Sequence, residues 1–250
     1  MDPYWWQLPV LVLVGTIAGI LNVLAGGGSL LTLPLLIFLG LPAATANGTN
    51  RIAIFFQNVF AISGFKRKGV FPLRLALICT GPALVGSYLG ARLAINIDEQ
   101  LFKQLLAIIM VGVLIFTAVD PMKRIRRDEM PITPLRLAVL LVSFFAIGVY
   151  GGFVQAGVGF IIIAGLLVHG LDLVRINAVK VLVIFAFTVV ALAVFVAHGQ
   201  VDYGLGLALA AGNSLGGWCA SHLAVNKGHE WIKHFVTVTV LIFALRLLWG

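Results

Sequence analysis

Two basic residues, Arg51 and Lys180, lie well inside long apolar stretches of this sequence, and each follows an asparagine by about one helical turn, Asn47 and Asn177. No Asp or Glu lies at a comparable depth in any apolar stretch of the sequence. In the middle of a bilayer a cation costs at least about 2.5–3.5 kcal/mol, and it marks a candidate functional site. A small anion supplies the missing negative charge through charge-assisted hydrogen bonds. Anion binding is therefore the chemistry that these residues predict.

Two glycine-rich breaks, at 25–29 (AGGGS) and 155–159 (QAGVG), interrupt the apolar sequence. Glycine lowers helix stability and frees backbone N–H groups, which in a bilayer must face protein, ligand or water. A helix that starts directly after such a break directs its positive dipole end and unpaired N–H groups into the break, which favours an anion there. We expect the two helix starts, near Ser29 and Phe160, to converge on one site.

The predicted substrate-binding residues come from these breaks and from the polar turns that follow them. They are Gly27, Gly28, Ser29, Asn47, Thr49, Asn50, Arg51, Gln155, Gly157, Gly159, Asn177 and Lys180. Other roles stay open for several of them, because long cations can snorkel to an interface and amide side chains can cap broken backbone. Gln57 and Asn58 can extend a polar stripe from Arg51, although interhelical hydrogen bonding is our preferred interpretation of that pair.

The composition places these residues in a membrane protein. Of the 250 residues, 61% are hydrophobic and 10% are charged, and the mean hydropathy is +1.09. Apolar stretches of helical length, without alternating polarity, predict an all-α polytopic protein in a lipid bilayer rather than a β-barrel. The net charge of +8 comes from basic residues clustered in short loops. Membrane orientation explains that clustering, and we exclude nucleic acid as a partner.

Ten apolar segments, five in each half of the chain, are predicted to be helical. They span residues 5–24, 29–41, 43–65, 72–94, 99–119, 134–154, 157–170, 172–197, 203–225 and 229–249. The second of each five is too short for an easy straight crossing, since a helix needs roughly 20 residues to span the bilayer. We expect these two segments to be broken or re-entrant helices near the bilayer midplane.

An internal repeat relates the two halves. When the sequence is shifted by 130 residues, glycines, asparagines and a lysine fall in register, as Gly27 does on Gly157. This predicts a first transmembrane repeat at 1–120, a basic cytoplasmic linker at 121–133 and a second repeat at 134–250. Each half holds an odd number of crossings, five or three, so the second repeat must be inverted relative to the first.

Charge placement gives an independent indication of inversion. The loop 66–68 is strongly basic, whereas its counterpart at 196–198 has no permanent charge. The positive-inside rule then places 66–68, 121–130 and 226–229 in the cytoplasm. We expect a multi-pass protein of the cell (inner) membrane with both termini outside the cytoplasm.

The glycine break at 26–28, the short apolar segment with Pro34, the stretch from Gly81 to Arg92 and the duplicated halves together resemble the TauE/SafE family of membrane proteins. The resemblance covers nearly the whole chain. It implies transport of a sulfur oxyanion or an organosulfonate. The second half departs from the family pattern, because it has Val158 within its break and no proline at the position that matches Pro34.

The predicted function is a secondary transporter that moves a small anion, such as sulfite, sulfoacetate or a related carboxylate, by alternating access. An anion channel and a non-transporting membrane assembly factor are the alternatives. The apolar stretches hold no nucleophile paired with a base and no metal-ligand spacing, so we expect no enzyme activity, catalytic residue, metal or cofactor. Four Gly-x-x-x-Gly motifs favour close packing of helices within the chain, with a homodimer as the other possibility.

Overall fold

The computed structural model describes residues 5–67, 69, 72–119, 133–167 and 173–223, and these ranges form nine α-helices and no β-strand. The helices are α1 (Gln7–Leu24), α2 (Ser29–Phe38), α3 (Ala43–Arg67), α4 (Leu73–Ile95), α5 (Glu99–Val119), α6 (Pro134–Phe153), α7 (Val158–Leu167), α8 (Leu173–Ala197) and α9 (Tyr203–Leu223). Each begins and ends within three residues of a predicted segment, which confirms the all-helical prediction for this part of the chain. The predicted segment 229–249 and, apart from Thr133, the linker 121–133 lie outside the described residues.

Within the described ranges, four helices are long and apolar enough to cross a membrane: α1, α4, α6 and α8. The helices α2 and α7 have 10 residues each. At about 1.5 Å per residue they extend only about 15 Å, roughly half of a hydrocarbon core of about 30 Å. Most residues of both short helices are buried, so α2 and α7 lie inside the protein.

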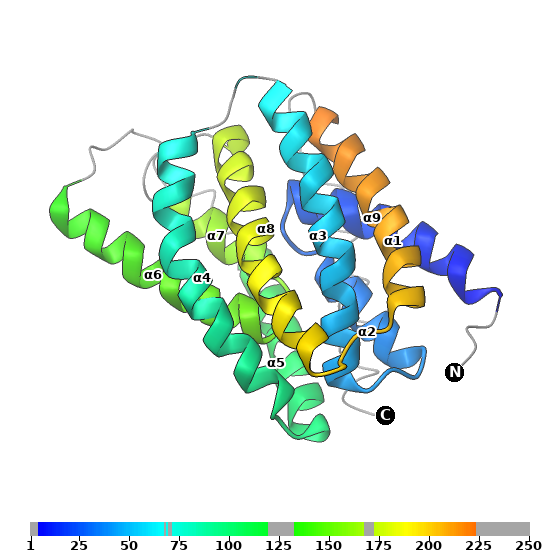
Figure 1. The fold of residues 1–250 in the computed structure, drawn as a ribbon. Helices are drawn as coiled ribbons and strands as arrows, with labels where there is room; N and C mark the ends of the chain where they lie inside the picture. The colour runs from blue at the N-terminus through cyan, green and yellow to red at the C-terminus, as the bar shows by residue number, and fades with distance from the viewer. Residues whose placement is uncertain (1–4, 68, 70–71, 120–132, 168–172, 224–250) are drawn as a thin grey trace.

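The helices pack in two groups, and each group combines both halves of the sequence (Figure 1). In the first group α1 and α3 both pack against α9, and α2 packs on α3. In the second group α6 and α8 both pack against α4, and α7 packs on α8. If 130 is added to or subtracted from the residue numbers, each of these helix pairs becomes a pair in the other group. We call them the α9 group (α1, α2, α3, α9) and the α4 group (α4, α6, α7, α8); they meet along α3 and α8.

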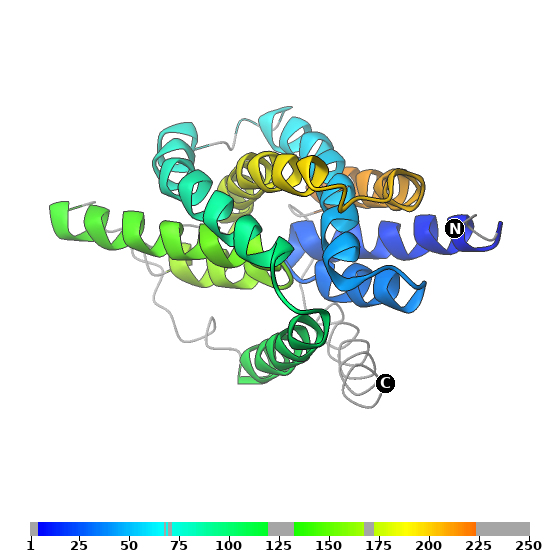
Figure 2. The same cartoon turned by 60° about the horizontal axis from the view of Figure 1, so that its bottom comes forward.

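Two helices lead into the centre of the molecule. Figure 2 shows α1 and α6 extending toward the middle from opposite sides. The helix α1 ends at Leu24 and α6 ends at Phe153, directly before the two breaks predicted from the sequence. The breaks therefore lie deep in the fold, where the α9 group faces the α4 group.

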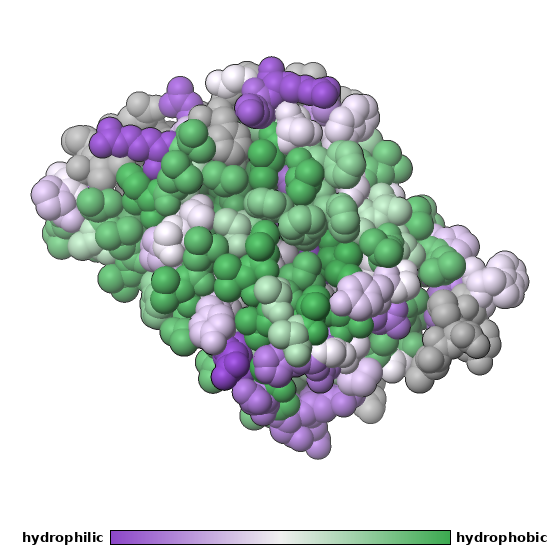
Figure 3. Space-filling model, viewed as in Figure 1, coloured by the Kyte–Doolittle hydropathy of each residue, from purple (hydrophilic) through white to green (hydrophobic). Residues whose placement is uncertain are grey.

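The surface has the polarity pattern of a protein that resides in a bilayer. Figure 3 shows an apolar band across the viewed face, with hydrophilic residues gathered along two opposite edges. The exposed basic residues Lys66, Arg67 and Arg74 lie at the connection from α3 to α4. The exposed acidic residues Asp98 and Glu99 lie at the other end of α4. Charged residues at both ends of α4, with an apolar band between them, are what a helix needs when it crosses between two aqueous surfaces.

Candidate functional site

The two glycine breaks touch each other. A Cβ atom on Gly26 would lie 2.4 Å from the Cα atom of Gly159, and a Cβ on Gly159 would lie 2.3 Å from the Cα of Gly26. Gly26 also has a φ of +89°, a conformation that side chains other than glycine rarely adopt. Both positions therefore require glycine, and this close approach brings the two halves of the chain together at one point.

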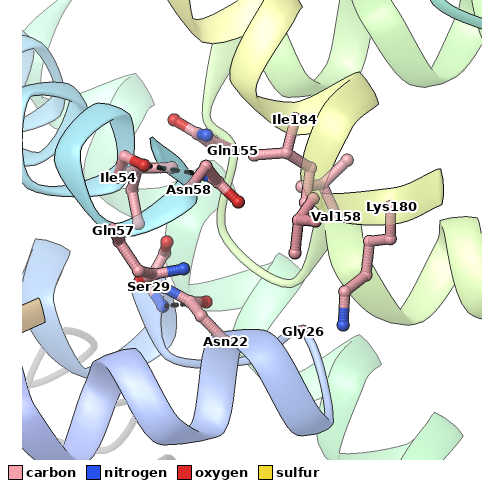
Figure 4. A pocket seen from close by; sticks show the side chains of 11 residues that line it. Asn22, Gly26, Ser29, Ile54, Gln57, Asn58, Gln155, Val158, Lys180 and Ile184 are labelled. Atoms are coloured by element: carbon pink, nitrogen blue, oxygen red, sulfur yellow. Dashed lines mark hydrogen bonds between the residues drawn. The ribbon is translucent and has the colours of Figure 1, made fainter. Parts of the chain in front are cut away.

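A small cavity lies beside this contact (Figure 4). Its water-accessible volume is about 10 Å³, roughly the space for one water molecule. Both helix groups contribute to its wall, together with the two breaks. The lining residues are Asn22, Gly26, Ser29, Ile54, Gln57, Asn58, Gln155, Val158, Lys180, Val181 and Ile184.

Lys180 supplies the positive charge of the cavity. It lies on α8 and is completely buried. Its Nζ donates to the backbone oxygen of Val23 at 2.8 Å and to Oδ1 of Asn177 at 2.7 Å. An ammonium group has three N–H donors, so one remains beyond these two bonds. Within the described ranges no carboxylate lies within ion-pair distance of Lys180. Its charge is therefore held by neutral oxygen atoms.

Arg51 is equally buried, but it does not line the cavity. Its guanidinium donates to the backbone oxygens of Gly151 at 3.1 Å and Gly152 at 2.5 Å. It also donates to the side-chain oxygens of Gln155 and Asn47, both at 3.3 Å. Nε has no hydrogen-bond partner among the described residues. Arg51 is thus bound to the end of α6.

Both cations satisfy carbonyl groups at a helix C-terminus. The last four carbonyls of a helix lack partners within the helix, and the bilayer core offers no water to replace them. A positive charge there also complements the negative end of the helix dipole. Lys180 donates to the last turn of α1, and Arg51 donates to the last turn of α6. At the end of α6, Nδ2 of Asn47 adds a bond to the Phe153 oxygen at 2.6 Å. Each cation therefore joins one helix group to the other.

A chain of hydrogen bonds runs along the cavity wall beside α1 and α3. The Ser29 N–H donates to Oδ1 of Asn22 at 3.2 Å, and Nδ2 of Asn22 donates to Oε1 of Gln57 at 3.0 Å. The same Gln57 oxygen accepts from Nδ2 of Asn213 at 3.3 Å. The first N–H of α2 is therefore already occupied by Asn22, which fixes the start of this short helix.

The other predicted polar residues bond elsewhere in the fold. The Thr49 hydroxyl accepts from the Asp202 N–H at 2.8 Å, and Oδ1 of Asn50 accepts from the Thr32 hydroxyl at 2.6 Å. Neither Thr49 nor Asn50 lines the cavity, and the same is true of Asn47 and Asn177. The structure thus brings Ser29, Gln155 and Lys180 together on the cavity wall and sets the other polar candidates apart from it.

The predicted glycines do not line the cavity. A Cβ on Gly27 would lie 2.6 Å from the Phe160 ring, and a Cβ on Gly28 would lie 2.0 Å from the Ala18 oxygen. Gly157 has a φ of +72°. These three residues, like Gly159, shape the backbone of the breaks.

The predicted substrate-binding residues did not include Asn22, Gly26, Gln57 or Asn58. All four line the cavity. Asn22 carried a signal, because it is a polar residue in an otherwise apolar run and precedes Ser29 by two helical turns. Gln57 does make the interhelical bond that was expected of it. No cluster of His, Cys, Asp or Glu suited to a metal ion occurs in the part of the chain that the structure describes.

The sequence profile of the family described as "Sulfite exporter TauE/SafE" matches residues 11–247. The chain belongs to the TauE/SafE family. Its relatives are named as transporters, and the chain is a membrane transporter of this family.

Full-length relatives of this TauE/SafE protein occur in several bacteria. A "Probable membrane transporter protein" of Haemophilus influenzae is 29% identical, over 97% of this chain and 94% of its own length. One from a Sinorhizobium species is 27% identical, over 96% and 92%. One from Escherichia coli K12 is 26% identical, over 97% and 90%. No solved structure matches the chain significantly.

Proposed function

We propose that this TauE/SafE protein is a secondary transporter that carries a small anion through the cavity between its two breaks by alternating access. The expected substrates are sulfite, a sulfonate such as sulfoacetate, or a related carboxylate. The observation that carries the proposal is the Lys180 ammonium, which lies on the cavity wall with one donor beyond its two bonds and no carboxylate partner in the described ranges. An anion at this position neutralises the charge of Lys180 and accepts a hydrogen bond from its remaining N–H group.

The pairing of helix contacts supports an inverted relation between the two halves. The start of α3 meets the end of α8, since the Thr45 hydroxyl donates to Oε1 of Gln200 at 2.6 Å. The two helices therefore run in opposite directions, although they occupy matching positions in the repeat. In this arrangement the short helices α2 and α7 begin at the central breaks and run outward toward opposite faces.

Alternating access requires the two helix groups to separate on one side at a time. The cavity has room for about one water molecule, so a sulfonate fits only after the lining elements move apart. Arg51 lies eight residues into α3 and Lys180 seven residues into α8, and these helices begin at opposite edges of the molecule (Figure 1). The two cations therefore join the groups at different depths. Opening one side breaks the Lys180 bond to Val23, and opening the other breaks the Arg51 bonds to α6.

The expected orientation places both termini outside the cytoplasm in the cell (inner) membrane. The exposed basic residues Lys66, Arg67 and Arg74 at one edge support a cytoplasmic location for that edge. A cysteine introduced at Gly69, on this edge, is expected to react with a membrane-impermeant thiol reagent only after the cells are opened.

The test of transport is uptake of labelled sulfite, sulfoacetate, taurine and acetate into liposomes that contain the purified protein. We expect saturable uptake of at least one anion, and acceleration of uptake when the same anion is preloaded inside. Conductance that does not saturate would indicate a channel. Absence of uptake and conductance in protein shown to be folded would favour the assembly factor.

A further inference from the structure

Asn58 presents a buried acceptor to the cavity. Its side chain is 1% exposed, and its Nδ2 donates to the backbone oxygen of Ile54 at 2.8 Å. A carbonyl oxygen cannot donate, so this bond directs the amide nitrogen toward Ile54 and leaves Oδ1 at the other end of the amide. That oxygen is buried and has no hydrogen-bond partner in the described part of the chain. A buried polar atom without a partner is rare in native proteins and calls for an explanation.

The position of Asn58 points to a ligand as that explanation. Asn58 and Lys180 lie on opposite sides of the cavity (Figure 4). Gln57 lies next to Asn58, and its Oε1 is occupied by Asn22 and Asn213, so its amide nitrogen remains as a donor. The wall thus offers a cation and an amide donor together with one acceptor. A ligand that complements it carries negative oxygens and also an N–H or O–H group.

We propose that Asn58 makes the transport site selective for anions that carry their own hydrogen-bond donor. The class includes carboxylates and sulfonates with a hydroxyl or amino group, and oxyanions in their singly protonated form. The inference rests on the proposed function. The negative group of the ligand binds at Lys180, and its donor binds Oδ1 of Asn58. An anion without a donor leaves this oxygen desolvated and unpaired, and it binds less tightly for that reason.

Two matched pairs of anions test the proposal: acetate with glycolate, and ethanesulfonate with 2-hydroxyethanesulfonate. Within each pair the second member adds a hydroxyl group. We expect the half-saturating concentration for uptake by the wild-type protein in liposomes to be at least about tenfold lower for the hydroxylated member of at least one pair. In Asn58→Leu this ratio is expected to fall close to one, through weaker binding of the hydroxylated anion.

Thr80→Val is the control. The Thr80 hydroxyl is buried on α4 and donates to the Ala76 oxygen at 2.7 Å, and Thr80 does not line the cavity. The variant should keep the wild-type ratio. Should Asn58→Leu fail to fold, Asn58→Met supplies a flexible apolar side chain for the same comparison.

The outcomes separate this inference from the proposed function. Equal use of both members of each pair by the wild-type protein overturns the role of Asn58 and leaves anion transport standing. A wild-type ratio that persists in folded Asn58→Leu or Asn58→Met does the same. If the folded wild-type protein takes up none of these four anions and neither sulfite nor sulfoacetate, the proposed function fails, and the inference fails with it.

Discussion

Arg51 and Lys180 do the same structural work at two different helix ends, but they differ in how completely they are bonded. Arg51 makes four hydrogen bonds to groups at and around the end of α6 and lies away from the cavity. Lys180 makes one bond to the end of α1 and one to Asn177 on its own helix, and it lies on the cavity wall. The difference teaches that two buried cations in a repeated sequence need not share a role. Both cations join the two helix groups, and Lys180 is the better candidate for binding the anion.

The two breaks also differ, in their backbone conformation and in the side chains that hold them. The first break turns at Gly26, with a φ of +89°, and the second turns at Gln155, with a φ of +60°, and at Gly157. Gln155 is held there by a bond from Arg51 at 3.3 Å and by its own bond to the Thr188 hydroxyl at 2.8 Å. Both breaks share the close contact between Gly26 and Gly159. The Asn22 side chain holds the first break at Ser29, whereas Arg51 and Thr188 hold the second at Gln155.

The largest effect is expected from Gly26→Ala. The new Cβ would lie 2.4 Å from backbone atoms of Gly159, which cannot move away as a flexible side chain would, and alanine disfavours the required φ. We expect a loss of at least about 4 kcal/mol in the free energy of unfolding. Thermal unfolding of the purified protein in detergent measures the effect. Gly81→Ala is the control, because a Cβ on Gly81 meets nothing within 4 Å among the described residues.

Arg51→Met is expected to cost about 3–5 kcal/mol of stability, because it leaves the Gly151 and Gly152 oxygens without their donors in a dry interior. Unfolding midpoints of Arg51→Met and Lys180→Met should therefore differ, with Arg51→Met unfolding first. Equal midpoints would remove the distinction between a fully bonded and a partly bonded cation.

Lys180→Met is expected to lower anion uptake by about a hundredfold, which corresponds to about 2.7 kcal/mol, because the cavity loses its only described cation. Initial uptake rates in liposomes give the result, and amounts of folded protein are matched beforehand. Lys180→Arg keeps the charge and should retain part of the activity. Full uptake by Lys180→Met would show that Lys180 only caps the end of α1 and that the anion binds at another site.

The smallest effect is expected from Gly165→Ala in α7. A Cβ at this position meets no described atom within 4 Å, and alanine favours a helix over glycine by about 1 kcal/mol. We expect stability to rise by about 0.5–1 kcal/mol, with uptake unchanged. In the same short helix, Gly159→Ala should destabilise the protein strongly, because its Cβ would lie 2.3 Å from Gly26. A similar loss from both substitutions would argue that α7 tolerates no added atoms anywhere.

Sequence patterns predicted much of the local structure. The apolar runs predicted the nine described helices within three residues of their bounds, and the glycine runs predicted the two breaks. The polar stretch after each break does hold buried polar residues, but the expectation of a turn there was wrong, because both stretches are helical, in α3 and α8. The residues of the cavity were harder to select, because Asn22, Gln57 and Asn58 lie on helices whose rotation depends on their neighbours.

What the sequence determined by itself is therefore membrane residence, helix positions and the places where helices break, since hydrophobic run length and glycine act through local physics. The tertiary structure decided what the buried cations bind. Arg51 bonds to Gly151, 100 residues away, and Lys180 bonds to Val23, 157 residues away. Backbone carbonyls become available as partners only where a helix ends, and only the packing of the two groups brings those ends to the cations. The same packing left Asn58 and Lys180 facing one cavity, which no spacing along the chain reveals.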